Sequence, residues 1–212
     1  MEAKKIWVKS MERNPINKRE LRRNVLAKRD AMTEMERSRG SLHLTERILG
    51  HRWFYCSDII LGFVNYGSEI STIEILEEAL KTGKKLYLPK IVECAEINGQ
   101  TGNSAGTEMK FYRIESLEDL QEGYKGILEP DGTSEEFQYD VTLAEHIFML
   151  MPGVAFDRFR NRIGYGKGFY DRFLADKESL LLRTIAVGFK CQMVDEIPAE
   201  ENDIKPYQGI VV

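Results

Sequence analysis

The segment that decides how this chain folds spans residues 151–174 and reads MPGVAFDRFRNRIGYGKGFYDRFL. An apolar run at residues 147–151 leads into it and predicts a buried strand. The loop Gly164–Gly168 then carries a glycine at every second position and precedes a helix-like segment. Glycines permit positive φ and a close approach of the backbone to a ligand, and the first N–H groups of a helix attract anions. The layout predicts an anion site with Lys167 inside it, although the same spacing also occurs in ordinary turns.

Strands and helices alternate along the chain. The apolar run at residues 58–64 predicts a strand buried on both faces, and a helix follows it, opened by a capping box of Ser71 with Glu74. Other strands are expected at residues 85–89, 109–114, 183–189 and 209–212. Strands separated by helices predict an α/β fold with a mostly parallel sheet.

Ligands of such sheets bind beyond the carboxyl ends of the strands. Val64, Tyr66, Glu69 and Lys90 are expected at that edge. The carboxylate of Glu69 suits a hydrogen bond to a polar ligand edge, and it equally suits interaction with the N-terminus of the following helix.

Two helices precede the sheet. Asn17 with Glu20 predicts a capped helix over residues 18–31, and a capping box of Thr33 with Glu36 opens a second helix that ends near Gly50. We therefore expect a helical extension over residues 16–50. Residues 1–15 show no periodicity and are expected to be disordered.

Charge is distributed unevenly. Residues 1–29 contain ten Lys or Arg and three Glu, a net charge of +7 that leaves −11 for the remainder. A basic segment of this kind is typical of a solvated helix surface, of a segment that contacts nucleic acid, or of one that supplies cations to a phosphorylated small ligand.

Length and composition predict one globular domain over residues 16–212. Of the 212 residues, 42% are hydrophobic and 30% charged, and no apolar run approaches the roughly 20 residues that a membrane span needs. The first residues resemble no secretory signal, so a cytoplasmic location is expected. The three cysteines are odd in number and widely spaced, which predicts free thiols rather than disulfides or a zinc site.

The long motif also resembles a known family. PGVAFD at residues 152–157, followed by NRIGYGKGFYD at residues 161–171, is similar to the signature of the 5-formyltetrahydrofolate cyclo-ligases, also called 5,10-methenyltetrahydrofolate synthetases. The likeness extends over about residues 17–205, through Lys18-Arg19-x-Leu21-Arg22, Glu69-Ile70-x-Thr72, Glu129-Pro130 and Glu201-Asn202-Asp203. It implies a three-layer α/β/α fold with an N-terminal helical extension.

The resemblance also implies a reaction. The family closes a ring in 5-formyltetrahydrofolate to give 5,10-methenyltetrahydrofolate, with ATP and Mg²⁺ required and ADP and phosphate released. The γ-phosphoryl group activates the formyl oxygen, and such transfer depends on positioning and charge neutralisation. The expected partners are the folate, in monoglutamate or polyglutamate form, and ATP, with neither nucleic acid nor membrane, and the chain is expected to be a monomer.

The matching positions assign roles by resemblance. Lys167, as the main transition-state cation, and Arg162 are the expected catalytic residues. Asp171 and Asp203 are the expected Mg²⁺ ligands, although each also suits a plain surface acid. The expected ATP-binding residues are Lys18, Arg22, Arg162, Gly164, Tyr165, Gly166, Lys167, Gly168, Phe169 and Tyr170. The expected folate-binding residues are Val64, Glu69, Tyr165, Gly166, Lys167, Gly168 and Phe169.

The chain departs from the family pattern at three places, one of which is residues 1–15, a segment without a family counterpart. Arg160 stands where the family often has glycine, and Lys205-Pro206-Tyr207 replaces an acidic pair after Asp203. A protein of the same fold that binds folate or nucleotide without catalysis is the alternative. The joint presence of the cationic, acidic and glycine positions argues against it.

Overall fold

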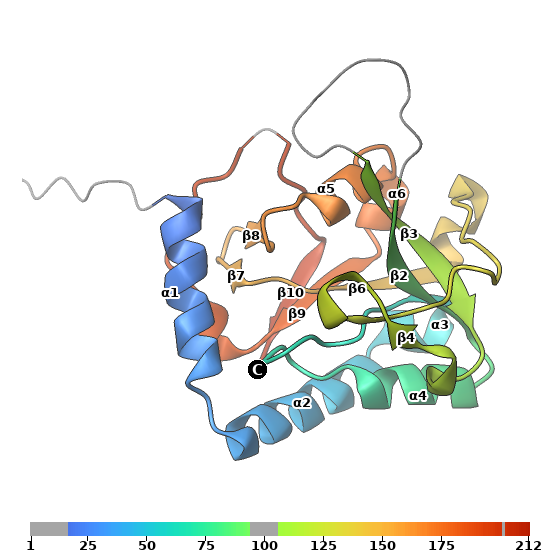
Figure 1. The fold of residues 1–212 in the computed structure, drawn as a ribbon, viewed down its shortest axis with the longest axis horizontal. Coiled ribbons are helices and arrows are strands. Elements are labelled where there is room, and N and C mark those ends of the chain that lie inside the picture. The colour runs from blue at the N-terminus through green and yellow to red at the C-terminus, as the bar shows by residue number, and fades with distance from the viewer. Residues whose placement is uncertain (1–16, 94–105, 201) are drawn as a thin grey trace, which may run out of the picture.

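The computed structural model describes residues 17–93, 106–200 and 202–212, and a six-stranded sheet crosses its centre (Figure 1). The strand order is β10-β9-β6-β1-β2-β3, and every neighbouring pair is parallel except β2 with β3. The α/β class and the mostly parallel sheet are thus confirmed. The strands are β1 (Ile59–Leu61), β2 (Lys85–Glu93), β3 (Thr107–Ile114), β6 (Ile147–Met151), β9 (Thr184–Gly188) and β10 (Gln208–Val211).

Helices cover both faces of the sheet, which gives the three expected layers. Phe148 and Leu150 of β6 pack toward α2 (Glu34–Leu49), α3 (Arg52–Cys56) and α4 (Ile73–Lys81), whereas Met149 and Met151 face α5 (Phe169–Leu174) and α6 (Glu178–Leu181). Figure 1 shows α2 and α4 below the sheet and α5 above it. All five residues of β6 are buried, as expected for a central strand whose sequence is apolar throughout.

The first helix, α1 (Lys18–Asp30), stands beside the sheet. The Asn17 side chain accepts a hydrogen bond from the backbone of Glu20 and caps it as predicted. Leu21 and Val25 are buried against a hairpin of β7 (Ala155–Phe156) and β8 (Arg162–Ile163). The Thr33–Glu36 capping box of α2 is also present. The disorder expected for residues 1–15 lies outside the described residues.

Two local predictions around β1 differ from the structure. The strand covers Ile59–Leu61 rather than residues 58–64, because its pairing with β2 and β6 ends there and the chain then turns toward α4. The Ser71–Glu74 capping box is wrong. The helix begins at Ile73 with Thr72 as an N-cap that makes no side-chain cap bond, because the Thr72 hydroxyl donates to the carbonyl of Phe63 instead.

Short elements join the larger ones. They are β4 (Gln121–Glu122) paired with β5 (Leu128–Glu129), and the 3-10 turns η1 (Leu117–Asp119), η2 (Tyr124–Gly126), η3 (Val141–His146) and η4 (Lys190–Gln192).

No helix in the described ranges combines the length and apolar character that crossing a bilayer requires.

Candidate active site

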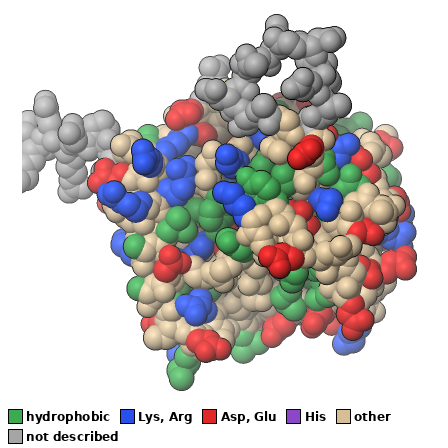
Figure 2. Space-filling model, in the orientation of Figure 1, with side chains coloured by type: hydrophobic (Ala, Val, Ile, Leu, Met, Phe, Trp, Pro, Cys, Tyr) green, Lys and Arg blue, Asp and Glu red, His purple; other side chains and the backbone are tan. Residues whose placement is uncertain are grey.

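A cavity of about 670 Å³ lies where α1, the segment after β1, β2 and the glycine loop meet. This volume is typical of pockets that hold small molecules. Every residue predicted above for ATP, folate or metal binding lines it, from Lys18 in α1 to Asp203 near the C-terminus. Figure 2 shows Lys and Arg side chains gathered on this face, beside exposed hydrophobic ones. The structure therefore brings the whole predicted set to one place.

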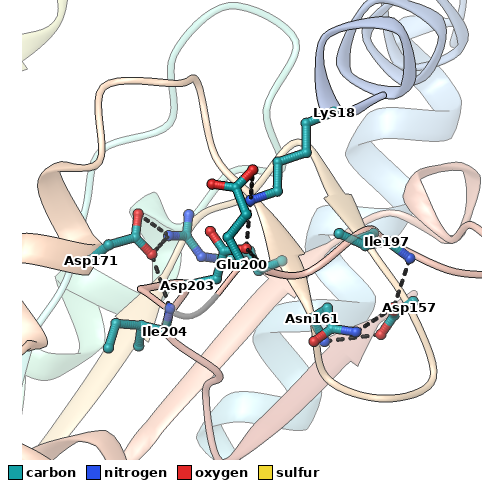
Figure 3. Close-up of polar contacts among 9 residues, drawn as sticks. Lys18, Asp157, Asn161, Asp171, Ile197, Glu200, Asp203 and Ile204 are labelled. Carbon is teal, nitrogen blue, oxygen red and sulfur yellow. Dashed lines mark hydrogen bonds and ion pairs between the residues drawn. The ribbon is translucent and has the colours of Figure 1, made fainter. Parts of the chain in front are cut away.

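A buried aspartate anchors the hairpin that carries the site. Asp157 is 5% exposed, and its two carboxylate oxygens accept four hydrogen bonds. Figure 3 shows the contacts of Asp157 with Asn161 and Ile197. Oδ1 accepts from the backbone N–H of Phe159 (2.8 Å) and Asn161 (2.9 Å), whereas Oδ2 accepts from the Asn161 side chain (2.7 Å) and the backbone of Ile197 (2.9 Å). Burial opposes its charge, but these bonds hold the pKa of Asp157 below its usual value. The ionised carboxylate thus ties β7, β8 and the C-terminal segment together.

Arg160 occupies the turn of this hairpin in an unusual conformation. Its φ is 67°, in the left-handed region that favours glycine. The Asp157 N–H donates to the Asn161 carbonyl, so the three-residue loop is the type that needs a left-handed last residue. The Arg160 guanidinium donates to the carbonyl of Tyr207 at 3.0 Å, which holds the side chain in place. The turn therefore keeps a glycine-like backbone without a glycine.

The glycine loop is shaped by positive φ at two of its glycines. Gly166 has φ 92° and Gly168, the N-cap of α5, has φ 64°. A Cβ on Gly166 would stand 3.3 Å from the guanidinium carbon of Arg22, and the Arg22 Nε donates to the carbonyl of Gly164 at 2.8 Å. The loop thus lies directly against α1, and Lys167 is exposed at its tip.

Each of two cations predicted to bind phosphate is paired with a predicted metal ligand (Figure 3). The Lys18 ammonium lies 2.5 Å from Asp203 and 3.1 Å from Glu200. The buried Arg162 guanidinium lies 3.3 Å from Asp171, which also accepts a hydrogen bond from the backbone of Ile204. These ion pairs balance the charge at the cavity wall. They also keep cationic and anionic side chains within reach of one ligand.

The donor set fits Mg²⁺. The described residues contain no group of three His, Cys, Asp or Glu side chains that could hold a metal by themselves. Mg²⁺ does not need one, since it is commonly bound by one or two carboxylates together with phosphate oxygens and water. Asp171 and Asp203 offer two carboxylates on the same cavity.

Glu69, which lines the cavity from the segment after β1, is 9% exposed. Its Oε1 accepts a hydrogen bond from the Tyr165 hydroxyl (2.6 Å) and its Oε2 from the backbone N–H of Tyr66 (2.8 Å). Burial raises the pKa of Glu69, while the bond from Tyr165 and the charge of Arg29 oppose that rise. The carboxylate thus has hydrogen-bond acceptor sites remaining toward the cavity.

The end of the cavity near β2 and β3 is largely apolar. Ile91 and Met109 line it together with Tyr124, whose ring meets Phe169 edge-on at 6.2 Å. Glu129, the acid of the Glu-Pro motif, is also on this wall and only 4% exposed. This end suits an aromatic or apolar part of a ligand.

Sequence reasoning did not select several wall residues. Ile91 and Met109 read as ordinary strand residues, so no local pattern marks them. Glu200 also pairs with Lys18, and Arg29 touches Tyr165. Arg29 lies behind the wall and shares a stripe of α1 with Lys18 and Arg22, a pattern that the sequence shows but that predicted no site role for Arg29.

Comparisons with known proteins give one consistent result. A sequence model of the 5-formyltetrahydrofolate cyclo-ligase family matches residues 14–211. A 5-formyltetrahydrofolate cyclo-ligase of Mus musculus is 29% identical over 195 residues, which cover 89% of this chain and 90% of the mouse protein. One of Escherichia coli K12 is 25% identical over 184 residues, covering 87% and 93% of the two chains.

Solved structures agree with the sequence relatives. The Aquifex aeolicus 5,10-methenyltetrahydrofolate synthetase is similar with a TM-score of 0.69 and 30% identity, covering 89% of this chain and 86% of that one. The family model covers nearly the whole chain and the solved structure has the same kind of fold, so both comparisons indicate the same family. The chain belongs to the 5-formyltetrahydrofolate cyclo-ligase family of enzymes.

Proposed function

We propose that this protein catalyses the ATP- and Mg²⁺-dependent closure of 5-formyltetrahydrofolate to 5,10-methenyltetrahydrofolate, with release of ADP and phosphate. One observation carries the proposal. A single cavity is lined by the phosphate-type cations of α1, the glycine loop, the two acids suited to Mg²⁺ and the buried Glu69. Family membership supplies the substrate class.

The reaction proceeds in two steps. The formyl oxygen attacks the γ-phosphorus of ATP, the bond from that phosphorus to the bridging oxygen breaks, and ADP leaves with its electrons. N10 then attacks the activated formyl carbon and loses its proton, and the C–O bond breaks to release phosphate. Both steps depend on alignment and on neutralising the phosphate charge.

Lys18, Arg22, Arg162 and Lys167 are the proposed phosphate-binding cations. Arg162 is held firmly by Asp171 and by the Pro152 carbonyl at 3.2 Å, so it offers a fixed charge. Lys167 lies on the exposed tip of the loop and supplies a charge that follows the transferred phosphoryl group. The backbone of the glycine loop, residues 164–168, leaves room for the phosphates to approach.

Asp171 and Asp203 are the proposed Mg²⁺ ligands. Bound Mg²⁺ would neutralise phosphate charge and hold the phosphate oxygens in line. In the described structure Lys18 neutralises the charge of Asp203, and Arg162 neutralises that of Asp171. When a nucleotide binds beside the metal, these two cations are therefore close enough to pair with its phosphates.

The folate is proposed to bind with its donor edge on Glu69 and its body along Val64 and the apolar wall. A carboxylate accepts two N–H donors side by side, which suits a polar ring edge. Polyglutamate preference, a cytoplasmic location and the monomeric state stay predictions.

A direct assay tests the proposal. Purified protein is mixed with 5-formyltetrahydrofolate and Mg·ATP, and the methenyl chromophore and ADP are followed together. Equal amounts of both products are expected. Absence of both, or ADP production that does not depend on the folate, would reject the cyclo-ligase reaction, and folate binding without turnover would favour the non-catalytic alternative.

A further inference from the structure

Arg29, in the last turn of α1, lies behind the cavity wall and is 3% exposed. Its Nε donates to the Ser68 hydroxyl at 3.0 Å, and its Nη2 donates to the Tyr165 hydroxyl at 3.0 Å. Its Nη1 is buried and has no hydrogen-bond partner within the described part of the chain. The guanidinium is thus fixed at two points and incompletely satisfied at a third.

Stability gives little reason for a cation at this position. A buried charge loses its hydration, and an apolar side chain of similar volume is often as stable or more so. Val25, one turn earlier on the same face, is such a residue and is 1% exposed. A guanidinium with an unfilled donor is therefore better explained by what it does to its neighbours.

The effect of Arg29 is to set the direction of two hydrogen bonds. A guanidinium only donates, so the Tyr165 oxygen must accept from Arg29. The Tyr165 hydroxyl then has its proton free for Glu69 Oε1, 2.6 Å away. Glu69 therefore accepts one hydrogen bond from the Tyr165 hydroxyl and one from the backbone N–H of Tyr66, so both of its oxygens act as acceptors.

Without Arg29 the opposite arrangement becomes available. A protonated Glu69 would donate to the Tyr165 oxygen, and the carboxyl group would then meet a ligand's N–H donors with fewer acceptor sites. Burial favours that neutral form, since it raises the pKa of Glu69. The cation behind the tyrosine opposes it.

We infer that Arg29 is a positioning residue that, through Tyr165, keeps Glu69 in the acceptor-only form required by the donor edge of the folate. The inference rests on the proposed function, because it takes Glu69 as the group that meets the folate. Arg29 itself contacts neither substrate.

The other titratable groups around this trio do not replace Arg29. Burial raises the pKa of both Tyr165 and Tyr170, so both remain neutral donors near Glu69. Burial likewise raises the pKa of the Cys191 thiol, which faces Arg29 from η4. Arg29 is the cation that opposes the rise in the pKa of Glu69.

Asp30 also belongs to this neighbourhood, since the Ser68 hydroxyl that accepts from Arg29 donates in turn to the Asp30 carboxylate. That contact holds the Ser68 hydroxyl in place. It fixes the Arg29 side chain and adds no proton to the Glu69 carboxylate.

Steady-state kinetics of Arg29→Met across about pH 6 to 9 test the inference. At neutral pH the variant should raise the KM for 5-formyltetrahydrofolate roughly tenfold, which is the factor for a carboxyl group whose pKa in the variant lies about one unit above the assay pH. The KM ratio to wild type should fall as pH rises, because Glu69 then ionises without help. At saturating folate kcat should change less than about twofold, since mainly binding is affected.

Arg23→Met is the matched control, because Arg23 lies on the same helix and is exposed. It should leave both constants at wild-type values. Arg29→Lys retains a charge but lacks the paired donors of the guanidinium, so it should show a smaller pH-dependent rise in the KM for the folate. If thermal unfolding shows that Arg29→Met is not folded, the Lys variant takes its place in the test.

An unchanged folate KM, or a rise that is equal at every pH, would reject the role of Arg29 while leaving the proposed function standing. Failure of the wild-type protein to turn over in the same series would instead reject the proposed function. The two failures are therefore distinguishable.

Discussion

Replacing Asp157 by Asn should unfold the protein far more easily than an ordinary surface change. The carboxylate accepts two hydrogen bonds on each oxygen, and all four donors are N–H groups. An amide offers only one oxygen. Whichever way the Asn side chain turns, its NH₂ group faces two N–H donors that cannot be satisfied.

The expected loss follows from these contacts. Each buried donor left without an acceptor costs about 1–3 kcal/mol, so two of them cost about 2–6 kcal/mol. That is a large part of the stability of a typical domain. Volume is nearly unchanged, so packing contributes little to the difference.

Urea unfolding of the two proteins measures the difference. The matched control is Asp140→Asn, because exposed Asp140 accepts both of its hydrogen bonds from Thr142 on one oxygen, which an amide can supply. Its urea midpoint should stay at the wild-type value. A loss of less than about 1 kcal/mol in Asp157→Asn would show that the four bonds do not act as described.

The pH dependence gives a second check on Asp157. Its hydrogen bonds hold its pKa in the folded protein below the usual value, so its contribution is present above the unfolded pKa and lost as pH falls through the folded one. The stability gap between wild type and Asp157→Asn should therefore narrow below about pH 4. A gap that stays constant on acidification would contradict an ionised Asp157.

Three further changes test the loop and its turn. Arg160→Gly and Arg160→Ala both lose the bond to Tyr207, but only glycine adopts the left-handed φ freely. The Gly variant should therefore exceed the Ala variant in free energy of unfolding by about 1 kcal/mol, and equal melting temperatures of the two would contradict the strain. Gly166→Ala should raise the KM for ATP, because φ is 92° and the new Cβ would crowd Arg22. The control is Gly209→Ala, where a Cβ meets nothing within 4 Å. Equal kinetics in the two variants would contradict this prediction. Lys167→Ala should lower kcat by roughly 100-fold, because the cation that follows the phosphoryl group is removed. Its melting temperature should not change, since the side chain is exposed. A variant that is less stable but keeps its specific activity would refute the proposed role.

Much of the fold was predictable because its signals are local. Asn17 and Thr33 cap their helices through residues three positions later, and the uniformly apolar β6 indicates a central parallel strand. Local reasoning failed where a distant group competed. The expected Ser71–Glu74 capping box is absent because the helix begins at Ile73 with Thr72 as its N-cap, and the Thr72 hydroxyl donates to the Phe63 carbonyl, nine residues back.

The sequence by itself determined the alternation of the main strands and helices, the glycine loop and the motifs that identify the family. Only the tertiary structure decided which of these residues meet. Lys18 and Asp203 are separated by 185 positions and Arg22 and Gly164 by 142, yet each pair is in contact. The pairing of Arg29, Tyr165 and Glu69 likewise depends on where α1 packs against the β7–β8 hairpin. Periodicity reports which face of an element is buried, but the neighbours of that face follow from strand order and helix packing, which no local pattern encodes.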